Sequence, residues 1–272
     1  MGVQQVGCFS FRQSDQEQCD YMQERQQELP FFPRYELDGR QMQYTQIGRD
    51  NDGRSAIIFL HGSPGSSGAY LDYLADTSLS RIATLISVDR PGFGYSDFGK
   101  AERSLERQSL LMEPILEKFK QRKVVLVGHS YGGPLAARMA MDFADQITGI
   151  VLVAPSIAPE LEPGIWWRKI IDWWGIRWLI PPAFRVCNQE ILPLKEELEA
   201  MLPLWPKITA QATIVQGSKD KLVPMENAFF AEKMLTNSQK VVVDMVDGGD
   251  HFILWSEYDR VKKAILEMLG ER

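Results

Sequence analysis

A serine in a short glycine-rich segment is the first group in this chain that could do chemistry. Ser130 stands at the centre of Gly128-His129-Ser130-Tyr131-Gly132, directly after the apolar run 124–127 and before a helix-length segment. A tight turn between a strand and a helix crowds the neighbours of its central residue, which explains the two flanking glycines. The central side chain of such an elbow projects outward, so Ser130 is the predicted nucleophile.

A serine hydroxyl is a weak nucleophile at neutral pH, so a general base must lie within hydrogen-bond reach. The chain contains three histidines. His61 opens a His-Gly turn, and His129 lies inside the elbow, where it faces away from the direction in which Ser130 must point. His251 follows the last apolar run within Gly248-Gly249-Asp250-His251. We therefore predict that His251 is the base.

A carboxylate should orient the imidazole and stabilise its protonated form. Asp220 follows Gly217 after an apolar run, at the end of a strand where open α/β sheets assemble their sites. Asp247 and Asp250 are alternatives because they lie near His251 in the sequence. Residues so close along the chain seldom place a carboxylate behind the ring, so Asp220 is the preferred prediction.

Acyl transfer also needs N–H donors for the developing oxyanion. The backbone N–H of Tyr131, directly after the nucleophile, is one predicted donor. The second is expected from the turn His61-Gly62-Ser63-Pro64-Gly65, which follows an earlier apolar run. Because proline has no N–H, we assign this role to the N–H of Ser63.

Short apolar runs alternate with amphipathic segments along most of the chain, which predicts a mainly parallel, doubly wound α/β sheet with helices on both faces. The predicted strands are 56–60, 84–88, 124–127, 149–153, 212–215 and 241–245. The predicted helices are 105–120, 134–143, 225–235 and 256–269.

Two stretches depart from this alternation. Residues 1–30 form a predicted polar N-terminal extension, in which Ser14 and Glu17 have the spacing of a capping box that starts an outlying helix. Residues 155–205 are rich in proline and tryptophan and contain no predicted strand, so we expect an inserted helical cap. The predicted core is then 31–154 together with 206–272.

Several of these motifs together resemble the α/β-hydrolase superfamily, in its serine-nucleophile, esterase-like and prolyl-aminopeptidase-like branch. The resemblance rests on the elbow and on four segments at 59–65, 89–96, 217–220 and 249–252, and it extends from about Gln43 to Leu269. It implies a hydrolase that needs no metal or cofactor and forms an acyl-enzyme intermediate, with Asp89–Ser96 as a structural loop. Serine at the elbow separates the chain from the similar haloalkane dehalogenases and epoxide hydrolases, whose nucleophile is a carboxylate.

The predicted cap suggests what Ser130 attacks. Residues 165–178 predict an amphipathic helix with a broad aromatic face, which would cover a water-excluding pocket suited to apolar acyl groups. The predicted substrate-binding residues on it are Trp166, Trp167 and Trp173. The same composition fits peripheral contact with a membrane. The predicted function is therefore hydrolysis of carboxylic esters by a serine hydrolase.

Other functions remain open at this stage. An acidic patch in the predicted cap could hold a substrate ammonium, which favours an aminopeptidase or amidase; its members are Glu160, Glu162, Glu190, Glu196, Glu197 and Glu199. Carbon–carbon bond hydrolysis would use the same three catalytic residues. A non-catalytic ligand-binding protein of the same fold is the alternative from another class.

The composition limits the partners. A net charge of −6 argues against nucleic acid, whose binding depends on clustered Lys and Arg. Cys8, Cys19 and Cys187 lack CxxC spacing, which predicts neither a zinc site nor a disulfide framework. Without an apolar N-terminal run the sequence as given predicts a cytoplasmic protein, whereas Val6-Gly7-Cys8 suggests the alternative of a bacterial lipoprotein anchored through Cys8. The oligomeric state has no sequence signal.

Overall fold

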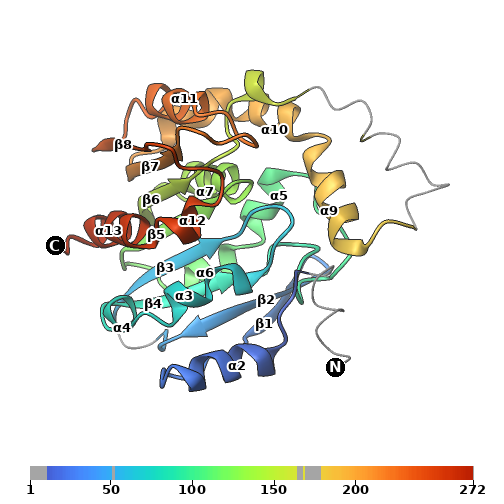
Figure 1. Ribbon diagram of the computed structural model, residues 1–272, viewed down its shortest axis with the longest axis vertical. Coiled ribbons are helices and arrows are strands. Elements are labelled where there is room, and N and C mark those ends of the chain that lie inside the picture. The colour runs from blue at the N-terminus through green and yellow to red at the C-terminus, as the bar shows by residue number, and fades with distance from the viewer. Residues whose placement is uncertain (1–10, 51–52, 164–167, 169–178, 272) are drawn as a thin grey trace.

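The computed structural model describes residues 11–50, 53–163, 168 and 179–271. Its centre is an eight-stranded sheet in the order β1-β2-β4-β3-β5-β6-β7-β8 (Figure 1). From β4 to β8 in this order, neighbouring strands pair in parallel. Strand β2 pairs antiparallel with β4, and β1 pairs antiparallel with β2. The strands are β1 (Arg34–Leu37), β2 (Arg40–Ile47), β3 (Ser55–Leu60), β4 (Ala83–Val88), β5 (Val124–His129), β6 (Ile147–Val153), β7 (Gln211–Gly217) and β8 (Val241–Val246).

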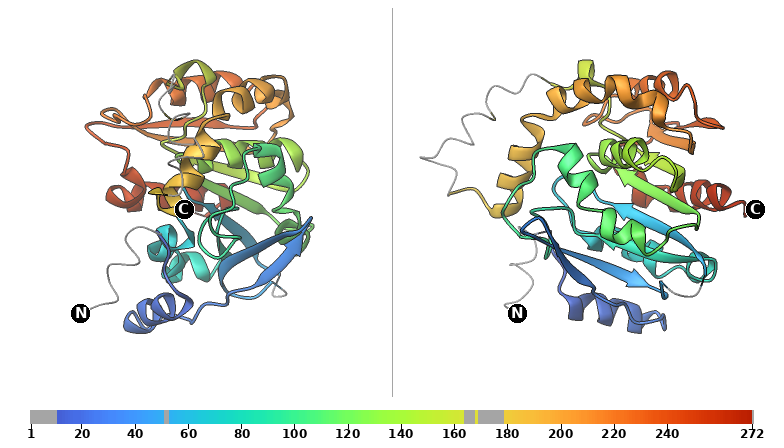
Figure 2. Two further views of the ribbon diagram at one scale, coloured as in Figure 1. Left: turned by 90° about the vertical axis from the view of Figure 1, so that its right-hand side faces the viewer. Right: turned by 180° about the vertical axis from the view of Figure 1, so that it is seen from behind.

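Helices cover both faces of this sheet, as the views from the side and from behind show (Figure 2). The helices of four residues or more outside the β6–β7 connection are α2 (Asp15–Glu24), η1 (Ser67–Tyr70), α3 (Leu71–Leu74), α4 (Thr77–Ser80), α5 (Leu105–Leu110), α6 (Glu113–Glu117), α7 (Gly132–Asp142), α11 (Glu226–Met234), α12 (Ile253–Ser256) and α13 (Tyr258–Leu269).

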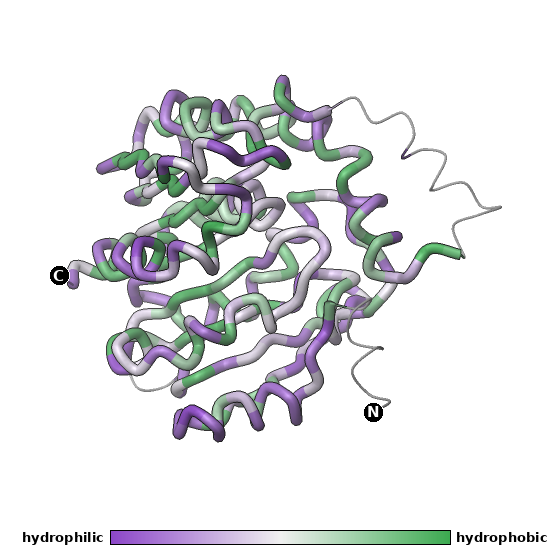
Figure 3. The backbone as a smooth tube through the Cα atoms, in the orientation of Figure 1, coloured by the Kyte–Doolittle hydropathy of each residue, from purple (hydrophilic) through white to green (hydrophobic). Residues whose placement is uncertain are grey.

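Alternation along the strands divides the core into two layers. On β3, Ile58 and Leu60 belong to a buried cluster with α5, α6 and α7, whereas Ile57 and Phe59 belong to a second cluster with α3, α4 and α13. Successive strand residues point to opposite faces, so a strand covered on both sides must be apolar throughout. The hydropathy colouring shows these apolar strands at the centre of the molecule (Figure 3).

The predicted mainly parallel α/β fold is confirmed, and each of the six predicted strands overlaps one of β3 to β8. The hairpin of β1 and β2 was not predicted. Its longer strand buries polar residues, Gln43, Thr45 and Gln46, so it lacks an apolar signature. Side-chain hydrogen bonds allow this burial: Thr45 Oγ1 donates to Gln18 Oε1 at 2.9 Å.

Helix α2 begins with the predicted capping box. The Glu17 N–H donates to Ser14 Oγ at 3.2 Å, and the Ser14 N–H donates to the Glu17 carboxylate at 2.7 Å. The helix is largely hydrophilic (Figure 3), but it does not stand apart from the domain. Met22 is fully buried in the core cluster that contains Ile57 and Leu85. The N-terminal helix is therefore packed against the sheet rather than outlying.

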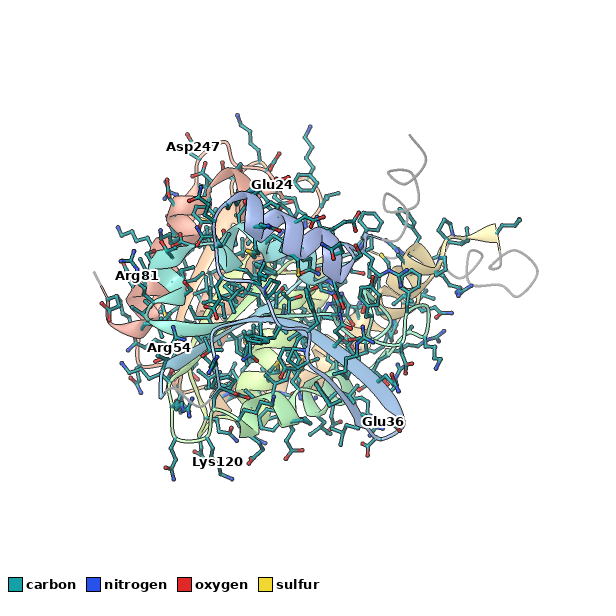
Figure 4. All side chains as sticks on the ribbon, turned by 90° about the horizontal axis from the view of Figure 1, so that it is seen from below. Glu24, Glu36, Arg54, Arg81, Lys120 and Asp247 are labelled. Carbon is teal, nitrogen blue, oxygen red and sulfur yellow. The ribbon has the colours of Figure 1, made fainter. Side chains whose placement is uncertain are left out.

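Charged side chains lie around the outside of the molecule, as labelled Glu36 and Lys120 illustrate in the view from below (Figure 4). The connection between β6 and β7 holds the predicted cap segment, whose described elements are η2 (Pro159–Leu161), α9 (Pro182–Ile191), α10 (Leu194–Met201) and η4 (Leu202–Lys207). Helix α9 lies at the side of the sheet where the strands end (Figure 1). None of the described helices is long and apolar enough to cross a membrane.

Replacing Met22 tests the packing of α2. Met22→Ala removes a fully buried side chain, so we expect the free energy of unfolding in urea to fall by about 2–4 kcal/mol. Gln23→Ala, at an exposed position of the same helix, should change it by less than about 0.5 kcal/mol. Equal effects of the two substitutions would contradict the anchoring of α2 by Met22.

Candidate active site

The elbow turn holds Ser130 in a conformation that side chains seldom adopt. Its φ is 54°, in the left-handed region. A Cβ on Gly128 would lie 2.2 Å from the Gly132 oxygen, and a Cβ on Gly132 would lie 2.0 Å from the Leu60 oxygen. Only glycine fits either position, because backbone atoms occupy the space of a side chain. The Gly-x-Ser-x-Gly spacing is therefore a steric requirement of this turn between β5 and α7.

The predicted base and acid are in direct contact. His251 Nδ1 lies 2.7 Å from Asp220 Oδ2. The Asp220 side chain is completely buried, and its Oδ1 accepts the N–H groups of Leu222 and Val223, each at 2.8 Å. Burial by itself would raise the pKa of Asp220, but these hydrogen bonds and that from His251 outweigh it, so the pKa lies below its usual value. The carboxylate is thus ionised and fixed behind the imidazole.

Neither alternative acid reaches the ring. Asp247 is exposed and lies 3.4 Å from the Ser218 hydroxyl, while the exposed Asp250 accepts the N–H of Phe252 at 2.8 Å. Both carboxylates serve the local turn. Among the three candidates, Asp220 is the one that contacts His251.

The other two histidines are committed to structural hydrogen bonds. His61 Nε2 accepts the Arg90 N–H at 3.1 Å, and its Nδ1 lies 2.7 Å from the Gly62 oxygen. His129 Nε2 lies 3.0 Å from the backbone oxygen of His251, so it donates there. Burial, then the neighbouring His251, lowers the pKa of His129 to about 4. A neutral His129 therefore supports the loop that carries His251.

Ser130 and His251 line the same two cavities. The hydrogen bonds among the described residues do not include one between Ser130 Oγ and the imidazole. Such bonds are often long before substrate binds. The structure thus brings the two side chains to one site without joining them directly.

Both predicted oxyanion donors lie beside Ser130. A Cβ on Gly62 would be 3.1 Å from the Ser130 Cβ, so the turn that carries Ser63 passes directly over the serine. Tyr131 is the N-cap of α7, where the first backbone N–H groups have no acceptor within the helix. Within the described part of the chain, neither the Ser63 N–H nor the Tyr131 N–H donates to another group. Both are available to a ligand oxygen.

A buried arginine connects this turn to the cap segment. Arg90 donates to the backbone oxygens of His61 and Gly62 at 2.8 and 3.1 Å. Its guanidinium forms a bidentate ion pair with Glu190 on α9, with both N–O distances at 2.8 Å and both side chains fully buried. It also lies 4.5 Å from the centre of the Tyr131 ring. Arg90 thus contacts both oxyanion-donor segments and α9.

Two cavities of different character meet at Ser130. The larger, about 650 Å³, is mostly apolar; its side-chain lining includes Phe11, Phe184, Leu222, Phe252 and Trp255. The smaller, about 210 Å³, is more polar; its lining includes Tyr131, Ser156, Glu162 and Arg168. A bound molecule with one apolar and one polar part would fit across the serine.

The predicted acidic patch is divided among separate roles. Glu190 is neutralised by Arg90, and Glu197 accepts the N–H of Leu105 at 2.7 Å. Glu162 faces the smaller cavity and accepts a hydrogen bond from Ser156 Oγ. Burial raises the pKa of Glu162, and the Ser156 bond and the charge of Arg168 oppose that rise. Of the predicted glutamates, Glu162 is the one that lines a cavity beside Ser130.

The predicted substrate-binding tryptophans and possible metal ligands are the remaining groups of interest. Trp166, Trp167 and Trp173 lie outside the described residues, so their predicted role in substrate binding stays a prediction. The described residues contain no group of three His, Cys, Asp or Glu side chains arranged to hold a metal ion.

Part of the chain is similar in sequence to a known family, and its backbone superposes on solved structures. Residues 55–185 match the model of a family described as alpha/beta hydrolase fold. The enol-lactonase of Burkholderia xenovorans LB400 superposes with a TM-score of 0.66 and 16% sequence identity, over 88% of this chain and 100% of that one. The chain has the α/β-hydrolase fold. The resemblance based on the sequence motifs is thereby confirmed.

The curated proteins that the chain resembles carry different activities. The chain is 34% identical to the proline iminopeptidase of Saccharolobus solfataricus over 40% of this chain and 36% of that protein. It is 22% identical to 2-hydroxy-6-oxononadienedioate/2-hydroxy-6-oxononatrienedioate hydrolase 1 of Pseudomonas putida, over 80% and 89%. The chain spans about a third of the length of two curated relatives that it matches, the iminopeptidase among them.

Glu190 offers a test of the buried ion pair. Glu190→Ala leaves the Arg90 guanidinium buried without its counter-ion, so we expect the free energy of unfolding to fall by roughly 3–5 kcal/mol. Glu199→Ala is the matched control, because Glu199 lies 4.0 Å from Lys195 with both side chains half exposed. Breaking that pair should cost less than about 1 kcal/mol. Similar losses in urea unfolding for both variants would contradict the central role of Arg90.

Proposed function

We propose that this α/β hydrolase cleaves carboxylic esters that carry an apolar group, through an acyl-enzyme formed on Ser130. The observation that carries the proposal is the contact between buried Asp220 and His251 at 2.7 Å, at a cavity shared with the strained Ser130. An ionised carboxylate behind an imidazole raises the ability of its other nitrogen to accept a proton. This arrangement has no evident purpose in a protein that only binds a ligand.

The reaction then proceeds in two halves. Ser130 Oγ attacks the carbonyl carbon as His251 Nε2 takes the hydroxyl proton, and the N–H groups of Ser63 and Tyr131 hold the oxyanion. The intermediate collapses when the protonated His251 gives its proton to the leaving alcohol oxygen. Water next attacks the acyl carbon, His251 accepts its proton, and the same two N–H groups hold the second oxyanion. Return of that proton to Ser130 Oγ releases the acid.

The apolar cavity and the charge of Asp220 support the hydrolysis of an apolar ester at this site. The larger cavity presents aromatic and aliphatic side chains, which favour an apolar group, and it has a volume typical of small-molecule sites. Asp220 stays ionised through the cycle because three hydrogen bonds hold its charge. Formation of the imidazolium is therefore matched by a fixed opposite charge.

Removing the nucleophile is the direct test. In Ser130→Ala we expect loss of p-nitrophenyl butyrate hydrolysis by about a thousandfold or more, with the fold retained, because the covalent path is eliminated. Labelling by a fluorophosphonate probe should disappear with it. Ser256→Ala, at an exposed serine outside both cavities, should hydrolyse the ester and react with the probe as the wild type does. Undiminished hydrolysis in Ser130→Ala would refute the proposal.

An aminopeptidase is the second candidate, favoured by Glu162 in the smaller cavity and by the similarity to the proline iminopeptidase. The positive charge of Arg168, which lines the same cavity, repels a substrate ammonium. Burial raises the pKa of Glu162, which disfavours the ionised carboxylate that an ammonium would need.

We therefore expect the kcat/KM for p-nitrophenyl butyrate to exceed that for prolyl p-nitroanilide by at least about tenfold, since an uncompensated charge weakens transition-state binding. Assays of both substrates on the wild type and on Glu162→Gln check this. Faster arylamide cleavage that is lost in Glu162→Gln would assign the aminopeptidase activity instead.

A further inference from the structure

The segment before α2 forms part of the wall of the larger cavity. Phe11, Arg12 and Gln13 line the space that also contains Ser130 and His251. These residues are separated from the elbow by more than a hundred positions, and no motif marks them. Their place at the candidate site therefore follows from the packing of the chain.

Contacts of Arg12 and of the helix that follows hold this segment in position. The Arg12 guanidinium lies 4.7 Å from the centre of the Tyr95 ring and 5.0 Å from that of Phe98, in cation–π geometry. Directly after the segment, Ser14 caps α2, and Met22 anchors that helix in the core. The chain is thus attached to the body of the domain directly after Phe11, at Arg12, and again through α2.

Phe11 meets a residue of the cap segment across the cavity. Its ring packs edge-on against Phe184 of α9, with centroids 5.3 Å apart and planes at 75°. Both residues line the larger cavity, and both are more than a third exposed, whereas His251 is buried. The pair therefore lies on the solvent side of the cavity, with the catalytic side chains on the inner side.

We propose that Phe11 and Phe184 form the outer boundary of the apolar substrate subsite and limit the length of the ester chain that it accepts. The inference rests on the proposed function and specifies its substrate. An edge-to-face aromatic pair is attractive beyond its buried area, so the boundary holds without a covalent link. An apolar chain that ends before this pair stays within the cavity, whereas a longer chain must displace the two rings. Leu222, Phe252 and Trp255, which are also more than a third exposed, line the solvent side of the same cavity.

The experiment compares the kcat/KM for p-nitrophenyl octanoate with that for p-nitrophenyl butyrate. In Phe11→Ala and in Phe184→Ala we expect the octanoate-to-butyrate ratio to rise by about threefold to tenfold, the range of one aromatic pair. The double variant should rise no more than the larger single one, because both substitutions open the same contact. Phe31→Ala is the control: Phe31 is exposed at 47% and does not line the cavity, so the ratio should stay at the wild-type value.

The outcomes separate this inference from the proposed function. A wild type that neither hydrolyses the esters nor reacts with the fluorophosphonate probe contradicts the proposed function itself. If the wild type is active and the Phe11→Ala and Phe184→Ala ratios are unchanged or lower, esterase activity stands and the boundary is wrong. The rate of labelling by a small fluorophosphonate should be equal in all variants, which shows that the catalytic side chains are intact.

Discussion

A single buried guanidinium links three parts of this molecule that come from distant regions of the sequence. Arg90 follows β4, donates to the turn after β3, contacts the Tyr131 ring at the start of α7, and pairs with Glu190 on α9. A buried guanidinium that has no contact with water must be surrounded by hydrogen-bond acceptors and an opposite charge. Each of these groups is therefore held in place by its contact with Arg90. The position of α9 and the shape of the turn that carries Ser63 are thereby coupled.

The second constraint is the close approach of β3, β5 and α7. Because β3 pairs with β5, the turn that carries Ser63 and the elbow that carries Ser130 emerge side by side at the carboxyl ends of the strands. The distance between them leaves no room for a side chain at Gly132, and a Cβ on Gly62 would be in tight contact with Ser130. The strained backbone of Ser130 is maintained by this packing, which places the segments of Ser63 and Tyr131 beside it.

Much of this arrangement is readable from the sequence. Strands covered on both faces are unbroken apolar runs, and each of the three predicted catalytic residues follows such a run within a short glycine-containing turn. Strand β2 escaped prediction because its buried Gln43 and Thr45 are satisfied by hydrogen bonds that only the folded chain provides. The pairing of Arg90 with Glu190 joins residues 100 positions apart, and nothing local to either of them signals it. The place of Phe11 depends likewise on the docking of α2.

Phe11 and the last helix lie at opposite ends of the strands of the sheet. Phe11 borders the cavity at the carboxyl ends of the strands, whereas Leu269, at the end of α13, accepts a hydrogen bond from Lys123 just before β5, at the amino ends. Phe11 and the end of α13 are therefore not equivalent as points of attachment. An affinity tag, a fluorophore or an immobilising linker joined after α13 leaves the entrance of the cavity open, while the same attachment close to Phe11 obstructs it.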